Sequence, residues 1–175
     1  MRLLLTGATG FVARNFLLRV LKDYRYSDVI LPVRNPEKLK RQFKEDGLSS
    51  IPKNVRIIEA EAPGWNLSAL EPVDHLVHSA GVIFGRDWNE YHRANVEGTV
   101  NLLRGLSARP EKVIILSSQS ATGPCGPGQL CKTEGDTDTP LTWYGKSKLE
   151  MEQRLAKEFS DWNYLCLRPP MILGA

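Results

Sequence analysis

A tyrosine and a lysine stand four residues apart in the segment Tyr144-Gly-Lys-Ser-Lys148, at the start of a stretch with helical spacing. Residues four apart lie on the same side of a helix, so the phenol and the ammonium group should be neighbours. A phenol normally ionises at about pH 10, and a nearby positive charge lowers its pKa. The pair therefore predicts a proton donor or acceptor that works near neutral pH. The same spacing also occurs on ordinary solvated helix faces.

Two further polar side chains are candidates for the same site. The apolar run Val113–Ser117 is followed by Ser118, which would bring a hydroxyl to the end of a buried strand. We expect Ser118 to orient a substrate oxygen, with Ser120 as the second choice, because Ser-Ser-Gln-Ser leaves the register open. Asn95 lies in a long helical pattern, and a buried Asn needs hydrogen-bond partners. It is therefore a candidate anchor for the hydrogen bonds of the site.

The N-terminal segment Thr6-Gly-Ala-Thr-Gly-Phe-Val-Ala13 follows a predicted strand and opens a predicted helix. Gly7 permits a tight turn, Gly10 lets the backbone approach a pyrophosphate, and Ala13 allows close helix–strand packing. The helix N-terminus offers free N–H groups to phosphates. The segment predicts a dinucleotide site with contacts from Gly7, Thr9, Gly10, Phe11 and Val12.

The end of the second predicted strand indicates which dinucleotide is preferred. NAD sites usually place an acidic residue there, for the ribose hydroxyls. This chain has Arg34 instead, and Asp28 precedes the strand. Arg34 can pair with a 2′-phosphate, and Lys38 adds positive charge one helical turn later. The sequence therefore favours NADP over NAD.

Two more loops are predicted to border this dinucleotide site. Glu61 and Ala62 follow the third strand and could flank the adenine. The small residues Ser79, Ala80 and Gly81 follow the fourth strand and permit a close backbone approach to the cofactor.

These motifs need a scaffold, and the apolar pattern supplies one. Short apolar runs alternate with helical patterns, which predicts an α/β fold with a doubly wound parallel sheet of the Rossmann type and helices on both faces. Ligands bind such sheets beyond the carboxyl ends of the strands. The predicted strands are Arg2–Leu5, Val29–Val33, Val55–Glu59, His75–His78, Val113–Ser117 and Tyr164–Leu167; the predicted helices are Phe11–Tyr24, Pro36–Lys44, Trp88–Leu106 and Trp143–Phe159. Thr122–Pro140 is predicted to be a long irregular loop.

Composition narrows the function classes. The 175 residues include 23 basic and 20 acidic side chains, a net charge of +3 that argues against a nucleic-acid partner. No apolar run is long enough for a membrane span. Three cysteines without a pairing pattern or a His cluster argue against a disulfide framework and a metal site. We expect a cytoplasmic protein.

Taken together, the motifs resemble those of the extended short-chain dehydrogenase/reductase family, which includes NAD-dependent epimerases and dehydratases. The matching segments are Thr6–Phe11, His78-x-Ala80, Asn95–Thr99, Ser117-Ser118, Tyr144-x-x-x-Lys148 and Arg168-Pro-Pro-x-x-x-Gly174. The resemblance implies a Ser118, Tyr144 and Lys148 triad. It also implies that Lys148 holds the nicotinamide ribose and that Pro169 borders the nicotinamide. Thr122 replaces a tyrosine usual in the family.

The expected protein is an NAD(P)-binding Rossmann domain over residues 1–175, ending before most of a substrate-binding region. The leading hypothesis is an NADP-dependent oxidoreductase that transfers hydride to or from a carbonyl or alcohol carbon of a small-molecule substrate. The alternatives are an NAD-dependent nucleotide-sugar epimerase or dehydratase, a thioester reductase domain, and a dinucleotide sensor without catalysis. A homodimer is possible.

Overall fold

A computed structural model describes residues 1–23, 25–67 and 69–174. Its sheet has six parallel strands in the order β3-β2-β1-β4-β5-β6. This is the strand order of the Rossmann fold, which reverses direction between β1 and β4 and opens a crevice there. The strands are β1 (Arg2–Thr6), β2 (Asp28–Val33), β3 (Val55–Glu59), β4 (His75–His78), β5 (Lys112–Leu116) and β6 (Tyr164–Leu167).

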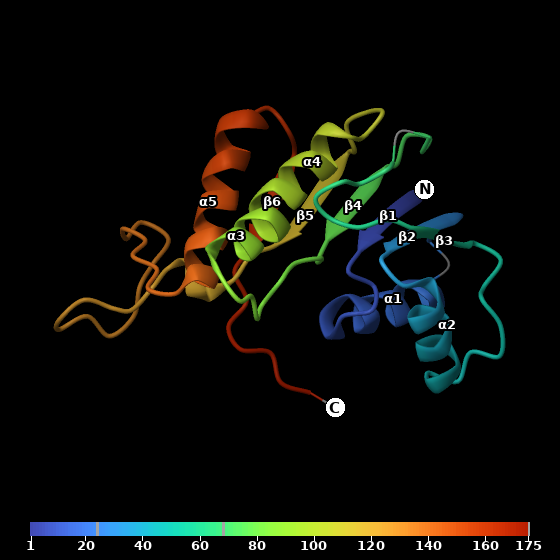
Figure 1. The fold of residues 1–175 in the computed structure, drawn as a ribbon, viewed down its shortest axis with the longest axis horizontal. Helices are drawn as coiled ribbons and strands as arrows, with labels where there is room; N and C mark the ends of the chain where they lie inside the picture. Colours follow the sequence, from blue (N-terminus) through green and yellow to red (C-terminus); the bar gives the residue numbers. More distant parts are fainter. Residues whose placement is uncertain (24, 68, 175) are drawn as a thin grey trace.

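Helices cover both faces of the sheet (Figure 1), and each layer buries its own core. Helices α1 (Phe11–Asp23) and α2 (Pro36–Glu45) pack with Leu17 and Leu39 against one face. Helices α3 (Trp88–Tyr91), α4 (Gly98–Arg104) and α5 (Trp143–Glu158) lie over the other. There Val100 and Met151 pack in the second core. The predicted fold class is confirmed.

The strands agree with the predictions to within one residue at each end, because continuous apolar runs mark strands that are buried on both faces. Helix α1 ends at Asp23, and Tyr24, the predicted last residue, lies outside the described residues. The single helix predicted over Trp88–Leu106 is wrong in detail. It ends at Arg104, and η1 (His92–Glu97) in its middle is a π-helix. Such stretches are rare and often occur at functional sites.

The irregular segment between η2 (Gln119–Ala121) and α5 projects away from the sheet (Figure 1). Two cations hold its ends together. The Lys132 Nζ donates to the Thr122 carbonyl at 2.7 Å and to the Thr139 hydroxyl at 3.0 Å. The Arg168 guanidinium, just after β6, pairs with Asp138 through two hydrogen bonds of 2.8 and 2.7 Å. The segment is therefore fixed at its base, close to the start of α5.

None of the helices within the described residues has the length and hydrophobicity that a membrane crossing requires.

Candidate functional site

The glycine-rich turn between β1 and α1 is shaped for close approach. Gly7 has a φ of 74°, a conformation that glycine adopts without strain. The Gly10 N–H donates to the Gly7 carbonyl at 2.8 Å and closes the turn. A Cβ on Gly7 would lie 2.7 Å from the Ala80 nitrogen, so no other residue fits without a shift of the β4 loop. The turns after β1 and β4 therefore meet at the crevice.

A cavity of about 290 Å³ opens beside this turn. It is bordered by the ends of β1, β2, β3 and β4. Among the predicted cofactor contacts, its lining contains Gly7, Thr9, Gly10, Arg34, Glu61, Ala62, Ser79, Ala80 and Gly81. Phe11, Val12, Lys148 and Pro169 are absent from this lining. Phe11 and Val12 are the first residues of α1, where their backbone stands at the helix N-terminus.

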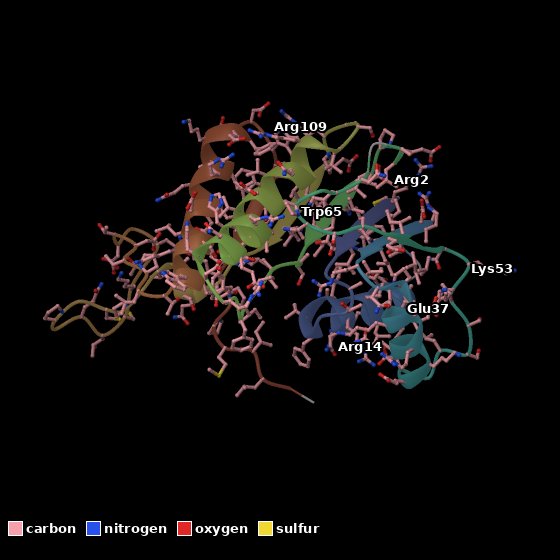
Figure 2. The ribbon with its side chains drawn as sticks, viewed as in Figure 1. Arg2, Arg14, Glu37, Lys53, Trp65 and Arg109 are labelled. Atoms are coloured by element: carbon pink, nitrogen blue, oxygen red, sulfur yellow. The ribbon has the colours of Figure 1, made fainter. Side chains whose placement is uncertain are left out.

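Sequence reasoning missed Trp65, which also lines the cavity. Its indole Nε1 donates to the Gly98 carbonyl of α4 at 2.6 Å, which fixes the ring between the loop after β3 and that helix (Figure 2). A Cβ on Gly98 would lie 2.8 Å from the Ala62 Cβ, so loop and helix are in close contact. No local pattern marks Trp65, because its partner is far away in the sequence.

Charged side chains gather where β2 and β3 end at the rim of the cavity. Arg34 and Lys38 both line it, and the Arg34 side chain is 83% exposed. The Arg34 Nε lies 3.9 Å from a carboxylate oxygen of Glu61. Asp28 was predicted to precede the strand, but it is the first residue of β2. It pairs with Arg56 at the opposite end of the sheet and is absent from the cavity lining. The rim thus has two cations and one carboxylate.

Lys148 is an ionisable side chain inside the protein, and it is only 5% exposed. Its Nζ donates to the Leu116 carbonyl at the end of β5, at 2.7 Å. Burial lowers the pKa of Lys148 to about 8, because the charged form loses its hydration. A Cβ on Gly81 would lie 3.5 Å from this Nζ, so the ammonium group reaches the wall of the cavity.

Tyr144 is half-buried one turn before Lys148 on α5. Its pKa is raised by burial, and the neighbouring Ser118 hydroxyl partly offsets that rise. This differs from the lowered pKa that the sequence predicted, because desolvation of the phenol dominates here. The ring centroid of Tyr144 lies 6.3 Å from that of Tyr91.

The two candidate serines occupy different environments. Ser118 is the N-cap of η2 and is half-buried, while Ser120 is exposed. The Ser120 carbonyl lies against Gly145, where a Cβ would clash with it. Of the two, Ser118 is the serine whose hydroxyl influences the pKa of Tyr144. That it orients a substrate oxygen stays a prediction.

Asn95 is completely buried in η1, and all of its side-chain groups have partners. Its Oδ1 accepts from the Val82 N–H at 2.8 Å, and its Nδ2 donates to the Val82 carbonyl at 3.0 Å and to the Ser147 hydroxyl at 3.0 Å. The Ser147 hydroxyl donates in turn to the Tyr144 carbonyl at 2.8 Å. Asn95 thus joins the loop after β4 to the start of α5.

The segment after β6 crosses near both halves of the site. The Pro169 carbonyl accepts from the Gln119 N–H at 3.0 Å, beside Ser118. Farther along, a Cβ on Gly174 would lie 2.6 Å from the Phe11 ring. Pro169 is therefore next to the serine turn, and the end of the segment is next to the glycine-rich turn.

These features fit a dinucleotide. There is no room for a Cβ at Gly7 or at Gly81, so the backbone itself, with its N–H groups, faces the crevice. The N-terminus of α1 begins at the same place. Residues of the turns after β1 and β4 line one continuous cavity. The buried Lys148 ammonium stands at the Gly81 side of that cavity.

Residues 3–175 match the sequence profile described as the NAD dependent epimerase/dehydratase family. The chain is 29% identical over 191 residues to a UDP-glucose 4-epimerase of Mus musculus, an alignment that covers 99% of this chain and 54% of that protein. It is 30% identical over 186 residues to a UDP-glucose 4-epimerase of Vibrio cholerae, covering 98% of this chain and 52% of that protein. The chain spans about half the length of these relatives.

Solved structures share the fold. The UDP-glucuronic acid 4-epimerase of Bacillus cereus, in complex with UDP-glucuronic acid and NAD, superposes with a TM-score of 0.79 at 24% identity. The match covers 96% of this chain and 56% of that one.

Proposed function

The chain belongs to the NAD dependent epimerase/dehydratase family, and from this premise we propose that it binds a nicotinamide dinucleotide for redox chemistry at a carbonyl or alcohol carbon of a small molecule. The observation that carries the proposal is the position of Lys148. Its buried ammonium group lies beside Gly81 at the wall of the cavity, one helical turn from Tyr144. The Leu116 carbonyl holds this ammonium group in place, and a buried ionisable group with a perturbed pKa in a cleft is typical of functional sites.

The binding half of the site consists mainly of backbone. The turn at Gly7 and Gly10 and the N-terminus of α1 receive the pyrophosphate through N–H groups, which need no cationic side chain. Phe11 and Val12 contribute their amides at that N-terminus. Glu61, Ala62 and Trp65 line the cavity and would border the adenosine, while Ser79–Gly81, which also line it, would approach the other half of the ligand.

The reacting half consists of side chains. When bound, the nicotinamide ring supplies the hydride donor or acceptor. Tyr144 exchanges the proton of the substrate oxygen, and Ser118 donates a hydrogen bond that orients this oxygen. With a pKa of about 8, Lys148 remains mostly charged at neutral pH. Burial raises the pKa of Tyr144. A positive charge beside a phenol favours its ionised form, and this is the role that we propose for Lys148 in the complex with the oxidised dinucleotide.

We assign the preference for NADP to this chain's own residues. Arg34 and Lys38 stand at the rim where β2 ends, and no carboxylate ends that strand. A guanidinium group binds a 2′-phosphate through two parallel hydrogen bonds. The B. cereus epimerase is in complex with NAD, and Glu61 near Arg34 is a carboxylate that can serve ribose hydroxyls. NADP specificity is therefore the part of the proposal that needs its own test.

Titration of the chain with NADPH and NADH, followed by Trp fluorescence, tests both points, because Trp65 lines the cavity. A charged hydrogen bond contributes roughly 1.5–3 kcal/mol, so Arg34→Ala should weaken NADPH binding by about 10-fold to 100-fold and leave NADH binding unchanged. Arg41→Ala, an exposed arginine on α2 outside the lining, is the control. Equal affinities for both dinucleotides in the wild-type chain would refute the NADP preference. Binding of neither would refute the dinucleotide site.

For the substrate class we propose nucleotide sugars, on the strength of the UDP-glucose 4-epimerases among the relatives. Incubation with UDP-glucose and either oxidised dinucleotide separates two reactions. A dehydrogenase accumulates the reduced dinucleotide, which absorbs near-ultraviolet light, while an epimerase yields UDP-galactose without net reduction. Tyr144→Phe is the control, since it removes only the hydroxyl. Neither product from a chain that binds the dinucleotide would refute this substrate class.

A further inference from the structure

A chain of buried hydrogen bonds passes beneath the site from β1 to η1. The Thr6 Oγ1 and the His78 Nδ1 are 2.7 Å apart, and the His78 Nε2 and the Thr99 Oγ1 are 2.9 Å apart. All three side chains are at most 2% exposed. Both hydrogen bonds join residues that are far apart in the sequence: Thr6 and His78 are 72 residues apart, and His78 and Thr99 are 21 residues apart.

The neighbouring contacts determine where each hydrogen lies. The Thr99 hydroxyl donates its only hydrogen to the Asn95 carbonyl at 2.8 Å, so it must accept from the His78 Nε2–H. The Nδ1 of His78 is then the acceptor, and the Thr6 hydroxyl donates to it. The Thr6 oxygen also accepts from the Ala80 N–H at 3.2 Å. The ring is therefore the neutral Nε2–H tautomer.

Electrostatics agrees with a neutral ring. Burial, with a smaller contribution from the Lys148 ammonium, lowers the pKa of His78 to about 3. The imidazole thus remains a fixed donor and acceptor near neutral pH.

The two ends of the chain reach opposite parts of the candidate site. At one end, Thr6 directly precedes Gly7 and binds the nitrogen of Ala80, and both Gly7 and Ala80 line the cavity. At the other end, Thr99 binds the carbonyl of Asn95, whose side chain fixes Val82 and, through Ser147, the start of α5. A buried polar chain of this kind has one satisfied arrangement and is rigid for that reason.

We infer that His78 and Thr99 are positioning residues that fix the glycine-rich turn relative to η1 and so keep the dinucleotide-binding turns in register with the helix carrying Tyr144. The inference rests on the proposed function, because it assigns the chain of hydrogen bonds to that site. A histidine with only a packing role in the core would also have hydrogen-bond partners. Its loss, however, would lower the stability of the whole fold without a specific effect on the cavity.

The first test is the tautomer of His78 in the wild-type chain. A long-range 1H–15N spectrum of the imidazole should show a hydrogen on Nε2 alone, with no titration from about pH 5 to pH 8, where an ordinary histidine changes charge. A hydrogen on Nδ1, or a charge change in that range, would overturn the inference.

The second test compares Thr99→Val with Thr99→Ser. Valine keeps the shape but removes the hydroxyl, so the Nε2–H loses its partner; serine keeps the hydroxyl. Thr99→Val should increase hydrogen exchange at the Ala80 and Val82 amides and raise the dissociation constant for the dinucleotide by about tenfold, as expected when a buried donor is left unpaired. Thr99→Ser should behave like the wild type in both measurements.

The outcomes separate this inference from the proposed function. If Thr99→Val and Thr99→Ser both fold and show the same amide exchange rates and the same dinucleotide affinity, the positioning role is overturned. That result would leave the dinucleotide site intact. A wild-type chain that binds no dinucleotide would overturn the proposed function, and the inference with it, because no site would remain to position. If Thr99→Val does not fold, Thr6→Val against Thr6→Ser breaks the chain at its other end, with the Ala80 amide as the same readout.

Discussion

Replacing Lys148 with methionine should change how the stability of the fold depends on pH. Burial lowers the pKa of Lys148 from its ordinary value of 10.5 to about 8. A lysine in the unfolded chain therefore keeps its proton at pH values where folded Lys148 has lost it. Because the unfolded state binds more protons between these two values, the free energy of unfolding rises with pH across that window. Below about pH 8 both states are protonated and the cost of burying the charge is fully present.

The magnitude follows from the same two values. Each pH unit corresponds to about 1.4 kcal/mol, so the difference between 10.5 and about 8 corresponds to about 3 kcal/mol. The side chain is 5% exposed, so solvent screening removes little of this. About 2 kcal/mol of the change should occur between about pH 8 and pH 9.5. The variant also loses the hydrogen bond to the Leu116 carbonyl, which adds an offset that does not depend on pH.

Urea unfolding of the wild type and of Lys148→Met, from about pH 7 to pH 9.5 at constant ionic strength, measures this difference. Cys166 acts in the opposite sense: burial raises its pKa from 9.0 to about 11, so it stabilises the fold below about pH 9 and that contribution is lost as the pH rises. It is present in both proteins and cancels in the comparison to first order. The control Lys146→Met removes an exposed lysine from the same helix and should keep the wild-type pH dependence. A constant difference between wild type and Lys148→Met would refute the desolvation of Lys148.

Three further substitutions test other parts of the site. Gly7→Ala should destabilise the fold by about 1–3 kcal/mol and abolish dinucleotide binding, because its Cβ meets the β4 loop. Gly47 has a similar φ but lies in open space, so Gly47→Ala shows the effect of backbone strain without that clash. Urea unfolding and dinucleotide titration of both variants measure the two effects. Tyr144→Phe should keep dinucleotide affinity but lower turnover by roughly 10²–10⁴-fold, the usual contribution of a positioned proton donor, and equal steady-state rates would exclude Tyr144 from the chemistry. Arg168→Met should cost about 2 kcal/mol, since it removes partly exposed ion pairs with both Glu152 and Asp138. Loss of the Asp138 pair should also speed tryptic cleavage in the segment between η2 and α5; unchanged cleavage would show that this pair does not fix the segment.

Much of the candidate site could be predicted from its turns. Gly7, Glu61 and Ser79–Gly81 were predicted one by one from the ends of separate strands, and they line a single cavity. These residues converge because the carboxyl ends of parallel strands meet at one edge of the sheet. That they contact a dinucleotide remains a prediction. Phe11, Val12, Lys148 and Pro169 were also predicted to contact the dinucleotide, but they lie outside that lining.

Trp65 and His78 illustrate what such reasoning misses. Trp65 follows no periodic pattern, and its hydrogen-bond partner Gly98 is 33 residues away. His78 was noted only as part of a family motif, although it joins Thr6 to Thr99. The different environments of Ser118 and Ser120 arise from a 3-10 turn that the Ser118 hydroxyl caps. Such contacts form only after the sheet has brought distant segments together.

The order of strands and helices, the glycine-rich turn and the placement of Tyr144 and Lys148 on one helix could all be predicted from the amino-acid sequence. These depend on local spacing: buried parallel strands are continuous apolar runs, and residues four apart share a helix face. The π-helical geometry around Asn95, the desolvation of Lys148 and the direction of each hydrogen bond around His78 became visible only in the folded chain. Those properties depend on which atoms surround a group in space, and the chain supplies these atoms from segments that are far apart in the sequence.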